Sequence, residues 1–136
     1  MKNAVVAYLS SLVTMVGLDA VWLTLTGKSL YRAHLGDLMA PGFSLPPAAL
    51  FYLVYVVGIV VFAVQPAIAS GRVGTAALRG ALLGLVAYAA YDLTNQATLH
   101  DWPMVVTVAD LCWGTALTAC AAGVGYWVTM AVRGRS

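Results

Sequence analysis

Four long apolar segments constrain this chain more than any other feature of its sequence. They run over residues 4–26, 48–67, 75–99 and 103–132, with glycine, proline or serine near their ends. A helix of about 20 apolar residues crosses the roughly 30 Å hydrocarbon core of a bilayer. The sequence therefore predicts an all-α integral membrane protein, a four-transmembrane-helix bundle that forms a single membrane domain over residues 1–136.

The composition excludes the main classes of soluble protein. Hydrophobic residues make up 62% of the chain and charged residues only 9%, too few to cover a surface exposed to water. A soluble enzyme and a disordered segment are therefore poor interpretations. The net charge is +2 without a basic cluster, so nucleic acid is not an expected partner, and the expected partner is the lipid bilayer.

The distribution of lysine and arginine predicts the orientation in the membrane. Four spans place both ends of the chain, and the connection between the second and third spans, on one side. That side holds five basic residues and the other holds two, namely Lys2, Arg72, Arg79, Arg133 and Arg135 against Lys28 and Arg32. Both termini are therefore predicted to be cytoplasmic, and a long loop over residues 27–47 is predicted to face outward.

Three aspartates interrupt the apolar segments: Asp19, Asp92 and Asp110. An aspartate at the centre of a spanning helix costs roughly 2.5–3.5 kcal/mol on insertion scales, so it needs an internal partner or water. Each of the three lies seven residues from the outward end of its segment, which corresponds to about 10 Å along a helix. Three helices thus carry a carboxylate at one depth, which predicts a shared polar pocket that opens outward.

Helical periodicity adds neighbours to each carboxylate. A tryptophan follows the first and the third aspartate by one turn, and Thr94 and Asn95 follow the second. The candidate ligand-binding residues are Asp19, Trp22, Asp92, Thr94, Asn95, Asp110 and Trp113. The second apolar segment has no charged residue and is predicted to be a lipid-facing or supporting helix.

Small residues one helical turn apart predict where helices approach closely. One such pattern is Gly80 and Gly84, and another is Thr115, Ala119 and Gly123. We expect this packing within one bundle, and a seam between two copies is the second interpretation.

Several chemistries remain open for the three carboxylates. Neighbouring carboxylates repel one another and share protons, which suits a small cation, a protonated amine or proton exchange. Carboxylate oxygens would bind Mg, Ca or Mn better than zinc, but no metal ligand is assigned and no cofactor is identified. The structural alternative is that the carboxylates only join helices. No nucleophile elbow, metalloprotease helix or phosphate loop occurs, which disfavours an enzyme.

Three motifs carry a family resemblance. They are Gly-Leu-Asp-Ala-Val-Trp-Leu at 17–23, Tyr-Asp-Leu-Thr-Asn-Gln-Ala-Thr-Leu at 91–99 and Asp-Leu-Cys-Trp-Gly at 110–114. Together they resemble the bacterial family of predicted membrane proteins catalogued as domain of unknown function 2177, and the likeness covers nearly the whole chain. The resemblance implies a small multi-pass protein of the bacterial inner (cytoplasmic) membrane, with four helices and no assigned activity.

These observations lead to three functional hypotheses. The first is an outward-facing acidic pocket that binds a small polar or cationic solute, with proton-coupled transport as one version. The second is a structural or partner-binding membrane protein, and the third is a membrane enzyme that acts on a lipid. Four helices enclose little space for transport, so a homodimer is a further expectation to test.

Overall fold

The computed structural model describes residues 1–134, and every regular element in that range is helical. Four helices are long and apolar enough to cross a membrane: Lys2–Leu38, Leu45–Ser70, Val73–Thr98 and Met104–Arg133. These limits differ most from the predicted ones at the end of the first span, which the sequence placed at residue 26. The predicted four-transmembrane-helix bundle is confirmed.

The outer faces of the helices are covered by large apolar side chains. Val13, Leu25 and Leu78, for example, are 71%, 72% and 73% exposed. Lipid tails are as apolar as leucine, so these side chains lose nothing by facing the bilayer.

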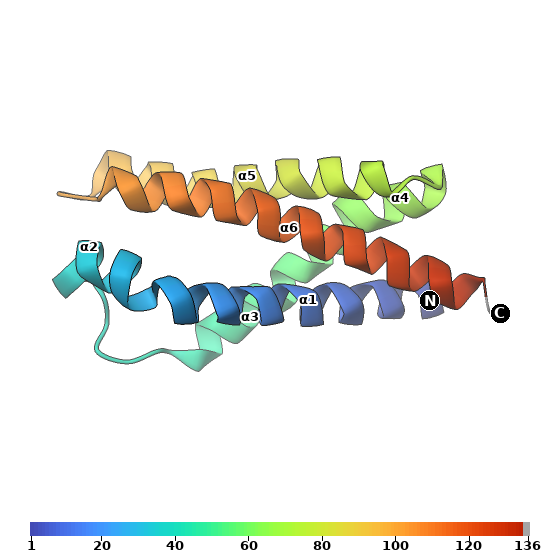
Figure 1. Cartoon of the computed structure of the whole chain (residues 1–136), viewed down its shortest axis with the longest axis horizontal. Coiled ribbons are helices and arrows are strands. Elements are labelled where there is room, and N and C mark those ends of the chain that lie inside the picture. The colour runs from blue at the N-terminus through green and yellow to red at the C-terminus, as the bar shows by residue number, and fades with distance from the viewer. Residues whose placement is uncertain (135–136) are drawn as a thin grey trace.

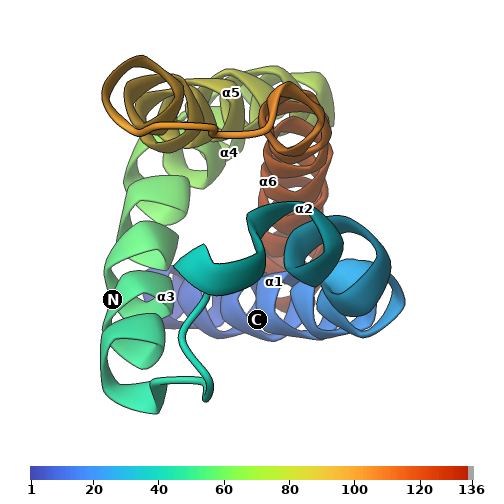
Figure 2. The same ribbon diagram turned by 90° about the vertical axis from the view of Figure 1, so that its left-hand side faces the viewer.

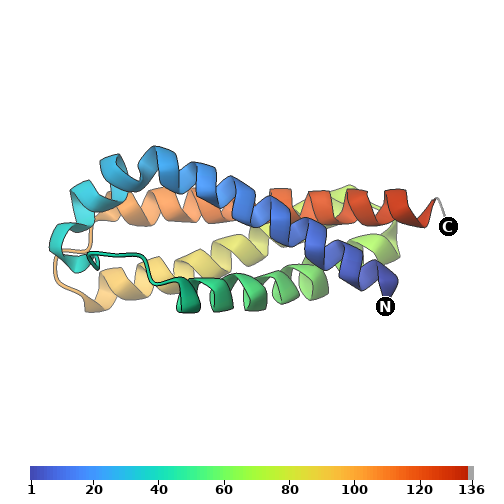
Figure 3. The ribbon, with the colours of Figure 1, turned by 90° about the horizontal axis from the view of Figure 1, so that it is seen from below.

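The helices form a ring in the order α1 (Lys2–Thr26), α6 (Met104–Arg133), α5 (Val73–Thr98) and α3 (Leu45–Ile59), as the end-on view in Figure 2 shows. Helix α6 packs along both α5 and α1, and α1 runs beside it (Figure 3). Helices α1 and α5 therefore lie diagonally opposite each other. Both termini lie at the same end of the bundle (Figure 1).

The first span continues beyond its predicted end. Helix α1 passes into a π-helical turn, η1 (Gly27–Arg32), then into α2 (Ala33–Leu35) and the 3-10 turn η2 (Gly36–Leu38). Gly27 keeps right-handed helical angles and does not end the helix, whereas Gly36 has a φ of +47°. The predicted loop over 27–47 is therefore wrong for most of its length, and only residues 39–44 join the first two spans without a helix.

The second span is part of the core. It consists of α3, the π-helical turn η3 (Val60–Val64) and α4 (Gln65–Ser70). Its inward side chains Val56, Ile59, Ala63, Val64 and Ala67 are 0% exposed. The predicted lipid-facing surface is present, since Leu50, Val54 and Phe62 are 62%, 63% and 59% exposed. The helix does more than support the bundle, however, because its inward side packs in the core.

The closest helix approach is the seam between α5 and α6. A Cβ atom on Gly84 would lie 2.1 Å from the backbone oxygen of Gly114, and one on Gly80 would lie 2.7 Å from that of Thr118. Two glycines of the first predicted pattern thus meet α6, as expected. On α6 the predicted pattern holds in part, since Cα of Ala119 lies 3.1 Å from a Cβ on Gly80, whereas nothing lies within 4 Å of a Cβ on Gly123.

Candidate functional site

The three intramembrane aspartates all point into the bundle. Asp19 in α1, Asp92 in α5 and Asp110 in α6 are 8%, 0% and 7% exposed. Asp110 interacts electrostatically with both of the other carboxyl groups. This agrees with the ring order, in which α6 lies between α1 and α5 and packs along both.

Asp19 is held by donors from two other helices. The hydroxyl of Tyr52, in α3, donates to Oδ2, and the indole Nε1 of Trp113, in α6, donates to Oδ1 at 3.0 Å. Hydrogen bonds to an ionised group are stronger than those between neutral groups. Asp19 thereby joins α1, α3 and α6 at one point.

Asp110 is held by a residue that lies beyond the first span's predicted end. The hydroxyl of Tyr31 donates to Oδ1 of Asp110, and the indole Nε1 of Trp22 donates to the Tyr31 hydroxyl at 2.8 Å. Tyr31 belongs to the π-helical turn η1. Such turns interrupt the α-helical register and occur often at functional sites.

Trp22 and Trp113 link these two arrangements. Their rings stack with centroids 4.6 Å apart and an interplanar angle of 6°. Each tryptophan lies one turn after an aspartate on its own helix, but its hydrogen bond leads to the aspartate of the other helix. Trp113 donates directly to Asp19, and Trp22 donates to Tyr31, which in turn donates to Asp110. The repeated Asp-x-x-Trp spacing therefore produces a reciprocal contact between α1 and α6.

Asp92 has a different environment. Its two carboxyl oxygens are buried, and no N–H or O–H group of the described residues donates to them. The polar group that faces them is the carboxyl group of Asp110. Two carboxylates are both acceptors, so this contact becomes a hydrogen bond only when one of the two carries a proton.

Neither of the other two candidates on α5 donates a hydrogen bond to Asp92. Thr94 is exposed, and its hydroxyl donates to the backbone oxygens of Ala90 and Tyr91 in its own helix. Asn95 is half-buried, and its amide interacts with the phenol of Tyr91. Thr94 follows Asp92 by two residues, about 200° around the helix, so the two side chains face opposite ways.

A cavity of about 300 Å³ reaches this cluster from the side of the bundle. It is lined by Phe51 of α3, by Ala87, Tyr88 and Tyr91 of α5, and by Asp110. Aromatic rings thus form most of its wall, and one carboxyl group lies at its polar side.

With this geometry established, the comparison with known proteins is informative. The sequence model of a family described as predicted membrane proteins, domain of unknown function 2177, matches residues 4–127. The chain belongs to this family. The match extends across all four spans and includes the three aspartates. No curated protein and no solved structure matches the chain.

As a member of this family of predicted membrane proteins, the chain is a multi-pass membrane protein in a lipid bilayer. Sequence reasoning did not find Tyr31 and gave Tyr52 no role in the site. Tyr31 was assigned to an outward loop, and Tyr52 lies in the span without charge. A usable signal existed for Tyr52, because a buried carboxylate needs donors and a charge-free helix can supply them only through groups such as its tyrosines.

Residues 1–134 contain no group of three or more histidine, cysteine, aspartate or glutamate side chains placed to hold a metal ion. Both histidines, His34 and His100, are exposed.

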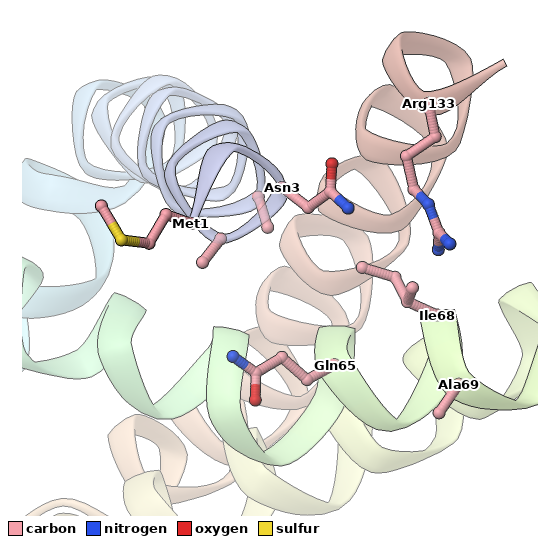
Figure 4. A pocket seen from close by; sticks show the side chains of 8 residues that line it. Met1, Asn3, Gln65, Ile68, Ala69 and Arg133 are labelled. Carbon is pink, nitrogen blue, oxygen red and sulfur yellow. The ribbon is translucent and has the colours of Figure 1, made fainter. Parts of the chain in front are cut away.

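A second cavity, of about 480 Å³, lies at the end of the bundle that holds the termini. The polar side chains of Asn3, Gln65 and Arg133 border it, from α1, α4 and α6 (Figure 4). No aspartate or glutamate lines this cavity.

Proposed function

We propose that this protein binds a small organic cation, a protonated amine, at the carboxyl pair formed by Asp92 and Asp110. The observation that carries the proposal is the state of Asp92, which is 0% exposed and receives no hydrogen bond from an N–H or O–H group. A buried polar group without a partner is costly, and evolution retains such a cost mainly at functional sites. A ligand that donates hydrogen bonds would remove the cost.

The chemistry of the pair favours exchange of a cation for a proton. Without ligand, a single proton between the two carboxyl groups supplies one hydrogen bond, which engages one oxygen of Asp92 and leaves its other oxygen without a donor. An ammonium group brings three N–H donors and one positive charge, so it replaces that proton, which leaves to solvent. Both carboxylates are then ionised and paired with the amine.

The walls of the cavity favour an amine over a metal ion. Phe51, Tyr88 and Tyr91 offer aromatic faces, which attract organic cations. Ca²⁺ takes six to eight oxygen ligands, and Mg²⁺ demands an octahedral set. One carboxyl pair beside aromatic rings therefore suits an organic cation better than either of these metal ions.

The proposed cellular setting is the bacterial inner membrane, with the carboxyl cluster toward the outward side and both termini cytoplasmic. An excess of basic residues at the terminal end supports this orientation, although Arg135 lies outside the described residues. In this orientation the exchange of amine for proton would be the first half of a proton-coupled transport cycle.

The test is proton release on binding. We would add alkylamine hydrochlorides at matched pH to purified protein in nanodiscs and follow a pH-sensitive dye in weak buffer. Wild type should release up to about one proton per chain, and amine affinity should rise by up to about tenfold per pH unit. Asp92→Asn should abolish the release, whereas Asp37→Asn, at an exposed site in η2, should leave it intact. Release that survives Asp92→Asn would refute the proposal.

A structural role is the second candidate, and it applies to Asp19. The hydrogen bonds from Tyr52 and Trp113 support this assignment, since they join three helices at one carboxylate. Asp19→Asn should therefore lower stability without changing the number of protons released. Loss of proton release in a folded Asp19→Asn protein would place Asp19 in the binding site instead.

A further inference from the structure

We infer that the ligand is an amphiphilic amine that reaches the carboxyl pair from the bilayer, through the gap between α3 and α5. The inference rests on the proposed amine site and adds the class of amine and the route of access. It depends on two observations, one at the end of the bundle and one at its side.

The end of the bundle nearest the carboxyl cluster is covered by the chain itself. The segment from η1 to α2 lies across this end of the helix ring (Figure 2). Tyr31 of this segment donates to Asp110 and is itself held by Trp22. A ligand from the water at this end would have to displace both contacts before it met Asp110.

The side of the bundle is open at the same level. The cavity of about 300 Å³ lies between α3 and α5, and the two aromatic residues at its mouth, Phe51 and Tyr91, are 45% and 59% exposed on the lipid-facing surface. Asp110 is the charged residue among those that line it. The route from the bilayer to the carboxyl pair therefore passes between aromatic rings.

A third cavity lies beside the cavity of about 300 Å³, along the outside of α3. It has a volume of about 390 Å³, shares Phe51 with the first cavity, and is otherwise lined by Pro47, Leu50, Val54 and Tyr55. A ligand with its ammonium group at Asp110 could place an alkyl chain over Phe51 and into this third cavity. The paired cavities thus match a molecule with one cationic end and one apolar body.

The ligand class follows from this shape. Each methylene group buried on binding contributes about fourfold in affinity. A short hydrophilic amine would use only the carboxyl end of the site, whereas an alkylamine would use both cavities. Selectivity should therefore increase with chain length.

The experiment compares hexylamine with methylamine in the proton-release assay and adds a variant that fills the mouth. Hexylamine should act at concentrations at least about tenfold lower than methylamine. Ala87→Trp places an indole in the cavity and should slow or abolish the hexylamine response. Ala77→Trp, an exposed position two to three turns earlier on α5, is the matched control and should respond like wild type.

The outcomes separate the inference from the proposal beneath it. Equal potency of the two amines, or a normal hexylamine response in Ala87→Trp, would overturn access from the bilayer while leaving the amine site in place. No proton release by either amine in wild type would refute the amine site itself. If Ala87→Trp does not fold, Phe51→Ala serves instead. Phe51 is exposed, and its replacement removes the ring that lines both cavities. The variant should therefore lose the preference for hexylamine over methylamine. A preserved preference would overturn the inference.

Discussion

The indole rings of Trp22 and Trp113 stack with centroids 4.6 Å apart. The N–H of Trp113 donates to Asp19 on the first span, and the N–H of Trp22 donates to Tyr31, whose hydroxyl donates to Asp110 on the last span. The contact ties the first and last spans of the bundle together at the depth of the acidic residues. It combines an aromatic pair with hydrogen bonds to carboxylates, and both kinds of interaction gain strength away from water.

The first prediction concerns this contact. Trp113→Phe keeps an aromatic ring but removes the donor to Asp19, so we expect a loss of about 1–3 kcal/mol in the free energy of unfolding. Circular dichroism during thermal unfolding in detergent would measure it. Trp127→Phe is the matched control, since Trp127 lies on the same helix and is 62% exposed. Equal effects of the two changes would contradict a special role for Trp113.

The second prediction separates two of the aspartates by stability. Asp19→Asn weakens the acceptor used by Tyr52 and Trp113 and should cost about 1–3 kcal/mol. Asp92→Asn removes no bond from a donor and gives Asp110 an amide N–H, so the melting temperature should stay level or rise. The comparison is made by thermal unfolding of the purified variants. A lower melting temperature for Asp92→Asn would indicate that Asp92 is a structural residue.

The third prediction concerns the seam between α5 and α6. A Cβ atom on Gly114 would lie 2.2 Å from the ring of Tyr88, so Gly114→Ala must displace that ring and should cost about 1–3 kcal/mol. Gly123→Ala, on the same helix, has no neighbour within 4 Å of the new Cβ and should be neutral or stabilising. Unfolding in a detergent titration would rank the two variants. The reverse ranking would show that the contact register on α6 is different.

The fourth prediction concerns orientation. In a background in which Cys112 and Cys120 are replaced by alanine, we would introduce Gly42→Cys and, separately, Gly74→Cys, two positions with open space around the Cβ. A membrane-impermeant maleimide should label Gly42→Cys in intact bacterial cells with a permeabilised outer membrane, and Gly74→Cys only after lysis. The opposite pattern would place both termini outside.

The sequence by itself determined the class of fold and the positions of its spans, except for the end of the first span. Apolar length and helical rise are properties of each segment alone, so four runs of hydrophobic residues were enough to predict four membrane helices. The same arithmetic placed Asp19, Asp92 and Asp110 at one depth, because depth along a helix depends only on residue number.

Only the tertiary structure decided which groups surround each carboxylate. That depends on the rotation of each helix about its axis and on the order of helices in the ring, and neither is a local property of the sequence. The ring order puts α6 between α1 and α5, and the π-helical turn η1 carries Tyr31 onto Asp110. Three aspartates that look equivalent in sequence therefore differ in structure, since Asp19 and Asp110 receive donors and Asp92 receives none from the described residues.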